Sequence, residues 1–345
     1  MASIPLTPSA DWASFSAPNA ELEQLLPSLG GFTIAGPGTT LDSFRAMSIP
    51  RAPSEKWAGV DEKDIQISMR DGYVNRARVY SSSGGSSEGK PLLVMLHGGG
   101  WVVGQLEQQE TECRSWVRKC GGVAVGVEHR LCPDVKFPVP VEDTFDALKW
   151  IAANCESLGA DPFKAFVLGG ISSGATTMTT ISHLWRDEGL APPLTGLYIS
   201  VPTVCVVADI PEKYKSRVLS WEQNKDAPVF NRASSGFLHR AVNPNPSDPL
   251  RSPLLFPTGH KNLPPTYFLI GGTDPWRDVG LLYEQILREE NAVKTKVDVF
   301  PGLPHGFWSI FPGSQFAREH REKSDEGLMW LLEHSDRLAI TKQEV

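Results

Sequence analysis

The hydrophobic positions of the chain follow two different patterns, one before residue 91 and one after it. Residues 64–69 and 74–80 alternate between polar and apolar side chains, and Asp71-Gly72 between them is typical of a tight turn. These two segments predict a hairpin of half-buried strands. After residue 91, short and mainly apolar runs predict strands buried on both faces, at residues 92–96, 123–127, 166–168, 197–199, 267–270 and 296–300.

Helix-like stretches separate these runs. The stretches lie at residues 142–154, 175–187, 279–290 and 315–337. Strands that alternate with helices predict an α/β fold with a mostly parallel central sheet flanked by helices. Residues 202–265 are too long for an ordinary loop, so we interpret them as a lid insertion. We expect an N-terminal cap segment, 1–60, that packs with this lid, and an α/β domain, 61–345, that contains it.

Composition narrows the function classes. The net charge of −7 comes without a block of Lys or Arg, so no nucleic-acid partner is expected. No run of 18 apolar residues occurs, which predicts no membrane span, and the first residues lack the pattern of a signal peptide. Five scattered cysteines without a Cys-x-x-Cys pair argue against disulfides and a zinc site. They favour a cytoplasmic location and no metal.

Ser172 is the candidate nucleophile. It stands in Gly170-Ile171-Ser172-Ser173-Gly174, directly between a predicted buried strand and a predicted helix. A sharp turn there exposes the serine hydroxyl, and small neighbours relieve the crowding. The alternative is an ordinary glycine-rich turn. A second Gly-x-Ser-x-Gly match, around Ser87, lies in a flexible Ser/Gly loop, and we reject it for lack of rigid support.

Three consecutive glycines follow the strand at 92–96. In the segment His97–Trp101, the backbone N–H groups of the three glycines are free to face a ligand, and with that of Ser173 they predict an oxyanion hole. A flexible loop tip or a phosphate cradle are the alternatives, although no Gly-Lys-Ser/Thr follows. His97 is expected to brace the loop.

An acid and a base follow two later strands. Asp274 and His305 come after Ser172 in the order expected for a Ser-Asp-His triad, each at the carboxyl end of a strand. Asp278 is the second candidate acid, although it is better placed to pair with Arg277 or to cap a helix.

The other histidines receive different assignments. We expect His129 to be structural, and His239 and His260 in the lid to approach the substrate. Three more lie in helix-like runs and are expected at the surface: His183, His320 and His334.

Several motifs together resemble one family. HGGGWVVG (97–104), the segment 128–150, GGISSGA (169–175), GGTDPWRD (271–278) and LPHGF (303–307) resemble the motifs of hormone-sensitive-lipase-type carboxylesterases. The resemblance runs from about residue 62 to residue 332. It implies an α/β-hydrolase fold with a helical cap, no cofactor, and Ser172, Asp274 and His305 as nucleophile, acid and base. It also implies Gly98, Gly99 and Ser173 as oxyanion donors.

The chain departs from this family in three places. Ile171 stands where the family usually has Asp, Ser173 where it has Ala, and His129 where it has Tyr. No triad member is lost, and a backbone N–H donor does not depend on the Ser173 side chain. We expect the loss of the acid at position 171 to change how the loops are held.

The expected function is hydrolysis of a small to medium ester through an acyl-enzyme. Trp101, Trp221, Phe307 and Trp308 are candidates to line its pocket, although core packing explains them equally well. The chain also resembles fungal esterases of secondary metabolism. Two other classes stay open: a lyase, dehydratase or other acyl-transfer enzyme that uses the same site, and a non-catalytic binding protein. The sequence leaves a homodimer open.

Overall fold

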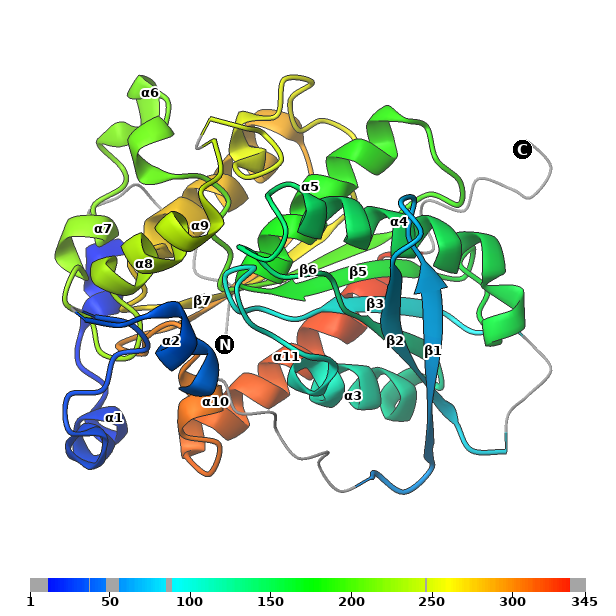
Figure 1. Ribbon diagram of the computed structural model, residues 1–345, viewed down its shortest axis with the longest axis horizontal. Helices are drawn as coiled ribbons and strands as arrows, with labels where there is room; N and C mark the ends of the chain where they lie inside the picture. The colour runs from blue at the N-terminus through cyan, green and yellow to red at the C-terminus, as the bar shows by residue number, and fades with distance from the viewer. Residues whose placement is uncertain (1–11, 37, 48–55, 85–88, 246, 336–345) are drawn as a thin grey trace.

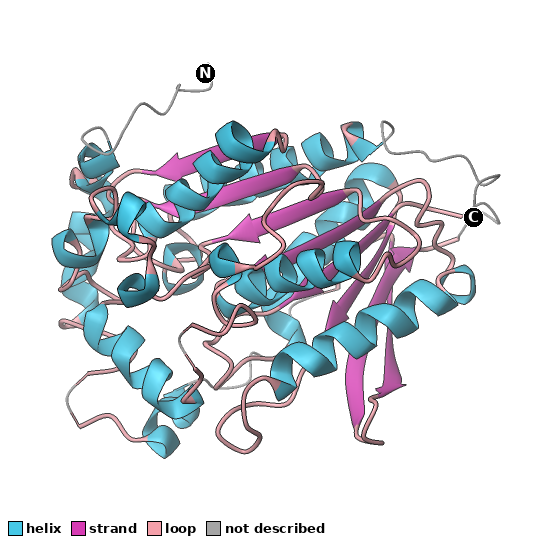
Figure 2. Ribbon diagram, turned by 90° about the horizontal axis from the view of Figure 1, so that it is seen from above, coloured by secondary structure: helices cyan, strands magenta, loops and turns pink. Residues whose placement is uncertain are grey.

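The computed structural model describes residues 12–36, 38–47, 56–84, 89–245 and 247–335. A single twisted sheet forms its centre, and helices cover both faces (Figures 1 and 2). Ser87, in the rejected second Gly-x-Ser-x-Gly match, lies outside the described residues. The predicted end of the last helix, at 336–337, also lies outside them.

The sheet contains eight strands in the order β1-β2-β4-β3-β5-β6-β7-β8. The first two strands pair antiparallel, β2 is antiparallel to β4, and β3 to β8 run parallel. The predicted strands and the mostly parallel sheet are therefore confirmed. Their bounds are β1 Val60–Ser68, β2 Val74–Ser82, β3 Leu92–Leu96, β4 Val123–Val127, β5 Phe166–Ile171, β6 Gly196–Ser200, β7 Thr266–Gly271 and β8 Thr295–Phe300.

The helices confirm the alternation of the sequence and add α3, which the hydrophobic pattern did not predict. The α9 helix continues as a π-helical turn at Ile286–Glu290. The bounds are α1 Ala20–Leu25, α2 Leu41–Met47, α3 Glu110–Cys120, α4 Val139–Asn154, α5 Ser173–Asp187, α6 Glu212–Lys215, α7 Ser220–Gln223, α8 Arg232–Val242, α9 Arg277–Gln285, α10 Phe307–Ile310 and α11 Gln315–Glu333.

Two apolar layers explain the continuous apolar runs. In β3, Leu92, Val94 and Leu96 join the core beneath α4, α5 and α9. Leu93 and Met95 point the other way, into the core beneath α3 and α11. Side chains alternate across a strand, so a strand covered on both faces needs apolar residues at every position.

The N-terminal segment and the insertion at 202–265 lie side by side at the end of the sheet toward which the parallel strands point (Figures 1 and 2). Backbone hydrogen bonds join them, from Ile34 to Val229 (2.8 Å) and from Val229 to Phe32 (3.2 Å). The rings of Phe44 and Phe237 pack with centroids 5.2 Å apart. The contact between the two segments that the sequence led us to expect is therefore present.

Two histidines that were expected at the surface are buried. His183 on α5 is fully buried, with its Nε2 3.0 Å from Nδ1 of His260. His320 on α11 stacks on Trp308 at 3.9 Å. Burial lowers the pKa of both His183 and His320 to about 3. The prediction was wrong because both helices turn these positions toward neighbouring elements.

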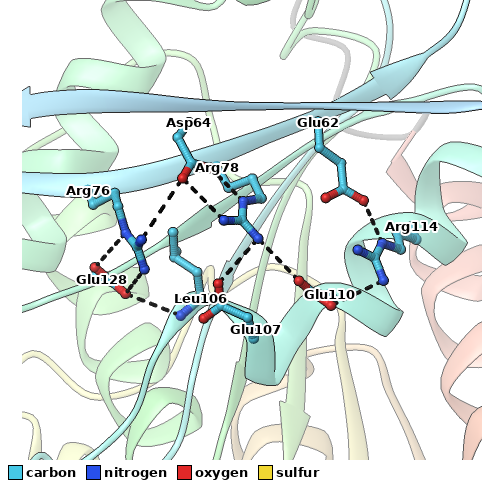
Figure 3. A network of polar contacts seen from close by, with 9 residues as sticks. All are labelled: Glu62, Asp64, Arg76, Arg78, Leu106, Glu107, Glu110, Arg114 and Glu128. Carbon is cyan, nitrogen blue, oxygen red and sulfur yellow. Dashed lines mark hydrogen bonds and ion pairs between the residues drawn. The ribbon is translucent and has the colours of Figure 1, made fainter. Parts of the chain in front are cut away.

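Arginines and carboxylates link the first hairpin to α3 (Figure 3). Arg78 on β2 contacts Asp64 on β1 and Glu110 on α3. Arg114 reaches Glu62 at 2.7 Å and Glu110 at 3.1 Å.

The same network reaches the end of the glycine-rich loop after β3. Glu128 pairs with Arg76 at 3.0 Å and accepts a hydrogen bond from the backbone N–H of Leu106 at 3.3 Å. These contacts fix the segment that follows residues 97–104 against β2 and the carboxyl end of β4.

Replacing Arg114 by Met removes the cation between Glu62 and Glu110, whose side chains are only 8% and 4% exposed. We expect a loss of about 3–5 kcal/mol in the free energy of unfolding, because Glu62 is left buried without a counter-charge, while Glu110 keeps its pair with Arg78. Urea unfolding followed by tryptophan fluorescence measures it. As a control, Arg76→Met removes a half-exposed pair and should cost less than about 1 kcal/mol. Equal losses in the two variants would contradict the expectation.

Candidate active site

Ser172 occupies the turn between β5 and α5. Its backbone has φ 55° and ψ −116°, a region that non-glycine residues rarely adopt. The turn is held on both sides, because the Ser172 N–H donates to Ser200 O at 2.8 Å and Thr176 N–H donates to Ser172 O at 3.0 Å. This conformation lifts the hydroxyl out of the sheet toward the carboxyl ends of the strands.

Glycines make room for this turn. A Cβ on Gly170 would lie 2.4 Å from the Gly174 carbonyl carbon, and a Cβ on Gly174 would lie 2.3 Å from His97 O. Both distances are far below van der Waals contact. The expected relief of crowding by small residues at these two positions is therefore present in the fold.

A line of hydrogen bonds runs from Ser172 to Asp274. His305 Nε2 lies 2.9 Å from Ser172 Oγ, and His305 Nδ1 lies 2.6 Å from Asp274 Oδ2. The other carboxylate oxygen of Asp274 accepts from the backbone N–H of Trp276 at 2.9 Å. Asp274 is 1% exposed, and Phe230 of the insertion stacks on the His305 ring at 4.6 Å. The base is thus oriented by a buried acid, as proton transfer from a serine requires.

Asp278, the second candidate acid, lies outside this line. It pairs with Arg277 at 2.7 Å, as the sequence led us to expect. It also accepts the backbone N–H groups of Leu219 and Ser220, at 2.8 Å and 2.7 Å. Asp278 therefore fastens the insertion to α9.

The glycine-rich loop passes close to Ser172. A Cβ on Gly98 would lie 2.9 Å from Ile171 O and 3.2 Å from the Cβ of Ser172. Gly99 has φ 117°, and a Cβ there would lie 2.0 Å from Val103 O. Glycine is therefore required at position 98 for the loop to approach the serine so closely, and at position 99 for the loop to fold back on Val103.

The side chain of Ser173 ties this loop to α5. Its Oγ accepts the backbone N–H of Trp101 at 3.3 Å, and the Trp101 indole donates to Thr177 Oγ1 at 2.9 Å. Alanine, the residue usual in the resembling family, cannot accept such a bond. The departure at Ser173 therefore changes how the loop is held, which the sequence did not lead us to expect.

Two neutral histidines pack beneath the loop. The rings of His97 and His129 lie 4.7 Å apart, and His97 Nδ1 is 2.8 Å from Gly98 O. Burial lowers the pKa of His97, and burial, with the neighbouring His97 imidazole as a second cause, lowers the pKa of His129 to about 3. Both are uncharged at neutral pH and serve as packing, in agreement with the structural role expected for them.

Ser172 lies between two cavities of about 420 and 300 Å³. Trp101 and Trp221 line the larger cavity, and Trp308 lines the smaller one. Phe230 and Leu238 line both cavities. The insertion thus separates two spaces that meet at the serine.

Two residues expected near the substrate lie elsewhere. Phe307 is fully buried between Phe300 and Phe316 and lines neither cavity, because the first turn of α10 points it into the core. His260 is likewise absent from both linings, since it packs on His183. His239 does line the larger cavity, as expected. Sequence reasoning missed three further lining residues of the insertion, because they belong to no motif: Phe230, Leu238 and Arg251.

Neither a cluster of metal ligands nor a membrane-spanning helix occurs in the part of the chain that the structure describes. Within it, no three His, Cys, Asp or Glu side chains group as metal ligands. No helix there has the length and apolar character to cross a bilayer.

A family model described as α/β hydrolase fold matches residues 93–309. The chain belongs to this family. An AB hydrolase superfamily protein of Schizosaccharomyces pombe is 37% identical over 275 residues, covering 80% of this chain and 81% of the relative. The versiconal hemiacetal acetate esterase of Dothistroma septosporum is 37% identical over 243 residues, covering 70% and 74%. The crystal structure of vibralactone cyclase superposes with a TM-score of 0.84 at 32% identity, covering 97% of this chain and 99% of that one.

These matches confirm the α/β-hydrolase fold and the resemblance to hormone-sensitive-lipase-type carboxylesterases. The chain is an enzyme of the α/β-hydrolase family, with relatives that are named as esterases.

Gly98→Ala tests the close approach of the loop. The new Cβ would meet Ile171 O at 2.9 Å, so either the loop or Ser172 has to move. We expect kcat on a p-nitrophenyl ester to fall by about 10- to 100-fold, because small displacements of reacting groups are costly. Gly313→Ala is the matched control, since a Cβ there meets nothing within 4 Å. If both variants keep the wild-type kcat, the tight fit is not required.

Proposed function

We propose that the protein is a serine carboxylesterase that hydrolyses small to medium esters through an acyl-enzyme. The proposal rests on the line from Ser172 Oγ through His305 to Asp274, with spacings of 2.9 Å and 2.6 Å, at the junction of two cavities. The similarity to an esterase named for a hemiacetal acetate supports an ester as the substrate.

In the first half-reaction, Ser172 Oγ attacks the ester carbonyl while His305 Nε2 takes its proton. Asp274 keeps the ring oriented and stabilises the imidazolium. The negative oxygen of the tetrahedral intermediate is placed against the backbone N–H groups of Gly98, Gly99 and Ser173. Such donors contribute about 3–4 kcal/mol each to transition-state stabilisation.

The two cavities then take different parts of the substrate. His305, which protonates the departing alcohol, lines the smaller cavity and is absent from the lining of the larger one. We therefore assign the alcohol to the smaller cavity and the acyl group to the larger. Water enters after the alcohol leaves, and His305 activates it to release the acid.

The N-terminal segment and the 202–265 insertion serve as the cap in this proposal. Phe44 of the first segment and Trp221 of the second line the two cavities from above the sheet. Their apolar side chains exclude water from the reacting carbonyl. The cavity volumes suit a small-molecule substrate rather than a polymer.

A second candidate is ring-forming acyl transfer. It is favoured by the similarity along nearly the whole chain to a protein named as a cyclase. In this case a hydroxyl of the bound acyl group, instead of water, attacks the acyl-enzyme, and a lactone leaves. Mass spectrometry of the products distinguishes the two: hydrolysis adds one water, and cyclisation adds none.

Ser172→Ala should lower kcat/KM on p-nitrophenyl esters by at least about 10,000-fold, because no acyl-enzyme can form. The variant should also lose labelling by a fluorophosphonate. Ser87→Ala, in the second Gly-x-Ser-x-Gly match, should keep both properties.

A lyase that uses the same site gives a different pattern. It loses its activity in His305→Ala yet keeps a large part of it in Ser172→Ala. That pattern, measured side by side at one pH, would overturn the esterase proposal.

A further inference from the structure

The larger cavity contains a buried cation. Arg251, in the insertion, is 7% exposed and lines this cavity. Its Nη1 donates to the carbonyl oxygen of Thr203 at 2.9 Å. Its guanidinium lies 4.9 Å from the ring of Trp101 and 5.9 Å from that of Trp276. The two indole rings thus hold the guanidinium at the cavity.

Arg251 differs from the other buried arginines of the described chain. Arg114 is paired with Glu62 and Arg277 with Asp278, each at 2.7 Å. Among the described residues, Arg251 has no carboxylate within ion-pair distance. A buried cation without a counter-charge is expensive, so its retention at a ligand cavity indicates an anionic ligand.

Arg251 stays charged at neutral pH in spite of its burial. Burial lowers its pKa to about 10, which leaves it protonated at neutral pH. His239, also in the cavity lining, has a pKa lowered by burial and by the positive charge of Arg251. Cys205 also lies near Arg251, and burial raises the pKa of its thiol to about 12, so it brings no negative charge. Asp209 raises the pKa of both groups from nearby, but it does not line the cavity and forms no ion pair with Arg251 among the described residues. Arg251 therefore keeps an unpaired positive charge in the cavity lining.

We propose that Arg251 binds a carboxylate carried by the acyl part of the substrate. The substrate is then a half-ester of a dicarboxylic acid. The planar guanidinium offers a fork of N–H donors that matches a carboxylate, and the tryptophans on either side keep water away. The inference rests on the proposed esterase function and on the assignment of the acyl group to the larger cavity.

Matched pairs of ethyl esters test the inference. Monoethyl adipate and ethyl hexanoate differ only in that a carboxylate replaces the terminal methyl group, as do monoethyl glutarate and ethyl pentanoate. Initial rates in a pH-stat give kcat/KM for each ester. We expect wild-type protein to favour the charged member of at least one pair by about 10-fold or more, the size of a charge-assisted hydrogen bond.

Variants assign this preference to Arg251. Arg251→Met should lower the ratio of charged to neutral kcat/KM by about 10- to 100-fold. Arg251→Lys keeps the charge without the fork of donors, so its ratio should lie between those of Arg251→Met and wild type. Arg240→Met removes the same charge from an exposed position of the cap and should keep the wild-type ratio. Equal ratios in wild type and Arg251→Lys, with no preference for charged esters, would overturn the inference even if Arg251→Met fails to fold.

A third pair of esters tests whether Arg251 binds a carboxylate on the acyl part or on the alcohol part of the substrate. In 5-acetoxypentanoate the carboxylate is on the alcohol, and pentyl acetate is its neutral counterpart. We expect no preference that depends on Arg251 in this pair. A preference seen only here would overturn the assignment to the acyl side.

The outcomes separate the two proposals. If wild-type protein hydrolyses neutral esters but its ratio is independent of Arg251, the inference fails and the esterase function stands. If no ester is hydrolysed, the esterase function fails, and adipate binding tests Arg251 alone. Since Trp101 and Trp276 flank the guanidinium, adipate should change tryptophan fluorescence in wild type, less in Arg251→Lys, and not in Arg251→Met. No change in wild type would overturn the inference.

Discussion

The strained turn at Ser172 constrains every element around it. A serine with φ 55° is stable only where its neighbours hold it, and here they hold it by close packing of backbone on backbone. Gly170, Gly174 and Gly98 bring β5, α5 and the loop after β3 so near to one another that a methyl group at any of them collides with backbone. The cost of this backbone is offset by the packing of the sheet and α5 behind it.

The loop that faces the serine is held from several sides. Ser173 and Thr177 on α5 bond to Trp101 at its middle. Glu128 takes the backbone N–H of Leu106 beyond its end, within the ion-pair network of the first hairpin (Figure 3). Neutral His97 packs beneath it. Long-range contacts thus make rigid a glycine-rich segment that would be mobile by composition alone.

The sheet and the insertion carry different residues of the candidate site. Ser172, Asp274 and His305 stand at the ends of β5, β7 and β8, where the sheet fixes their separation. Phe230 and Arg251 come from the insertion, which Asp278 fastens to α9 through backbone N–H groups. In the proposed function, the groups for the reaction are therefore carried by the sheet, and the groups that would select a substrate are carried by the insertion.

The sequence by itself determined the strands, their mostly parallel arrangement and the order of Ser172, Asp274 and His305. These follow from local signals: apolar runs need burial on both faces, and glycines mark the tight turns. Only the tertiary structure decided that Phe307 enters the core while Trp308 lines a cavity, and that His183 and His320 are buried. It alone placed Arg251 between two tryptophans. The direction of a side chain on a short helix or in an irregular insertion depends on packing partners far along the chain, and no local pattern records them.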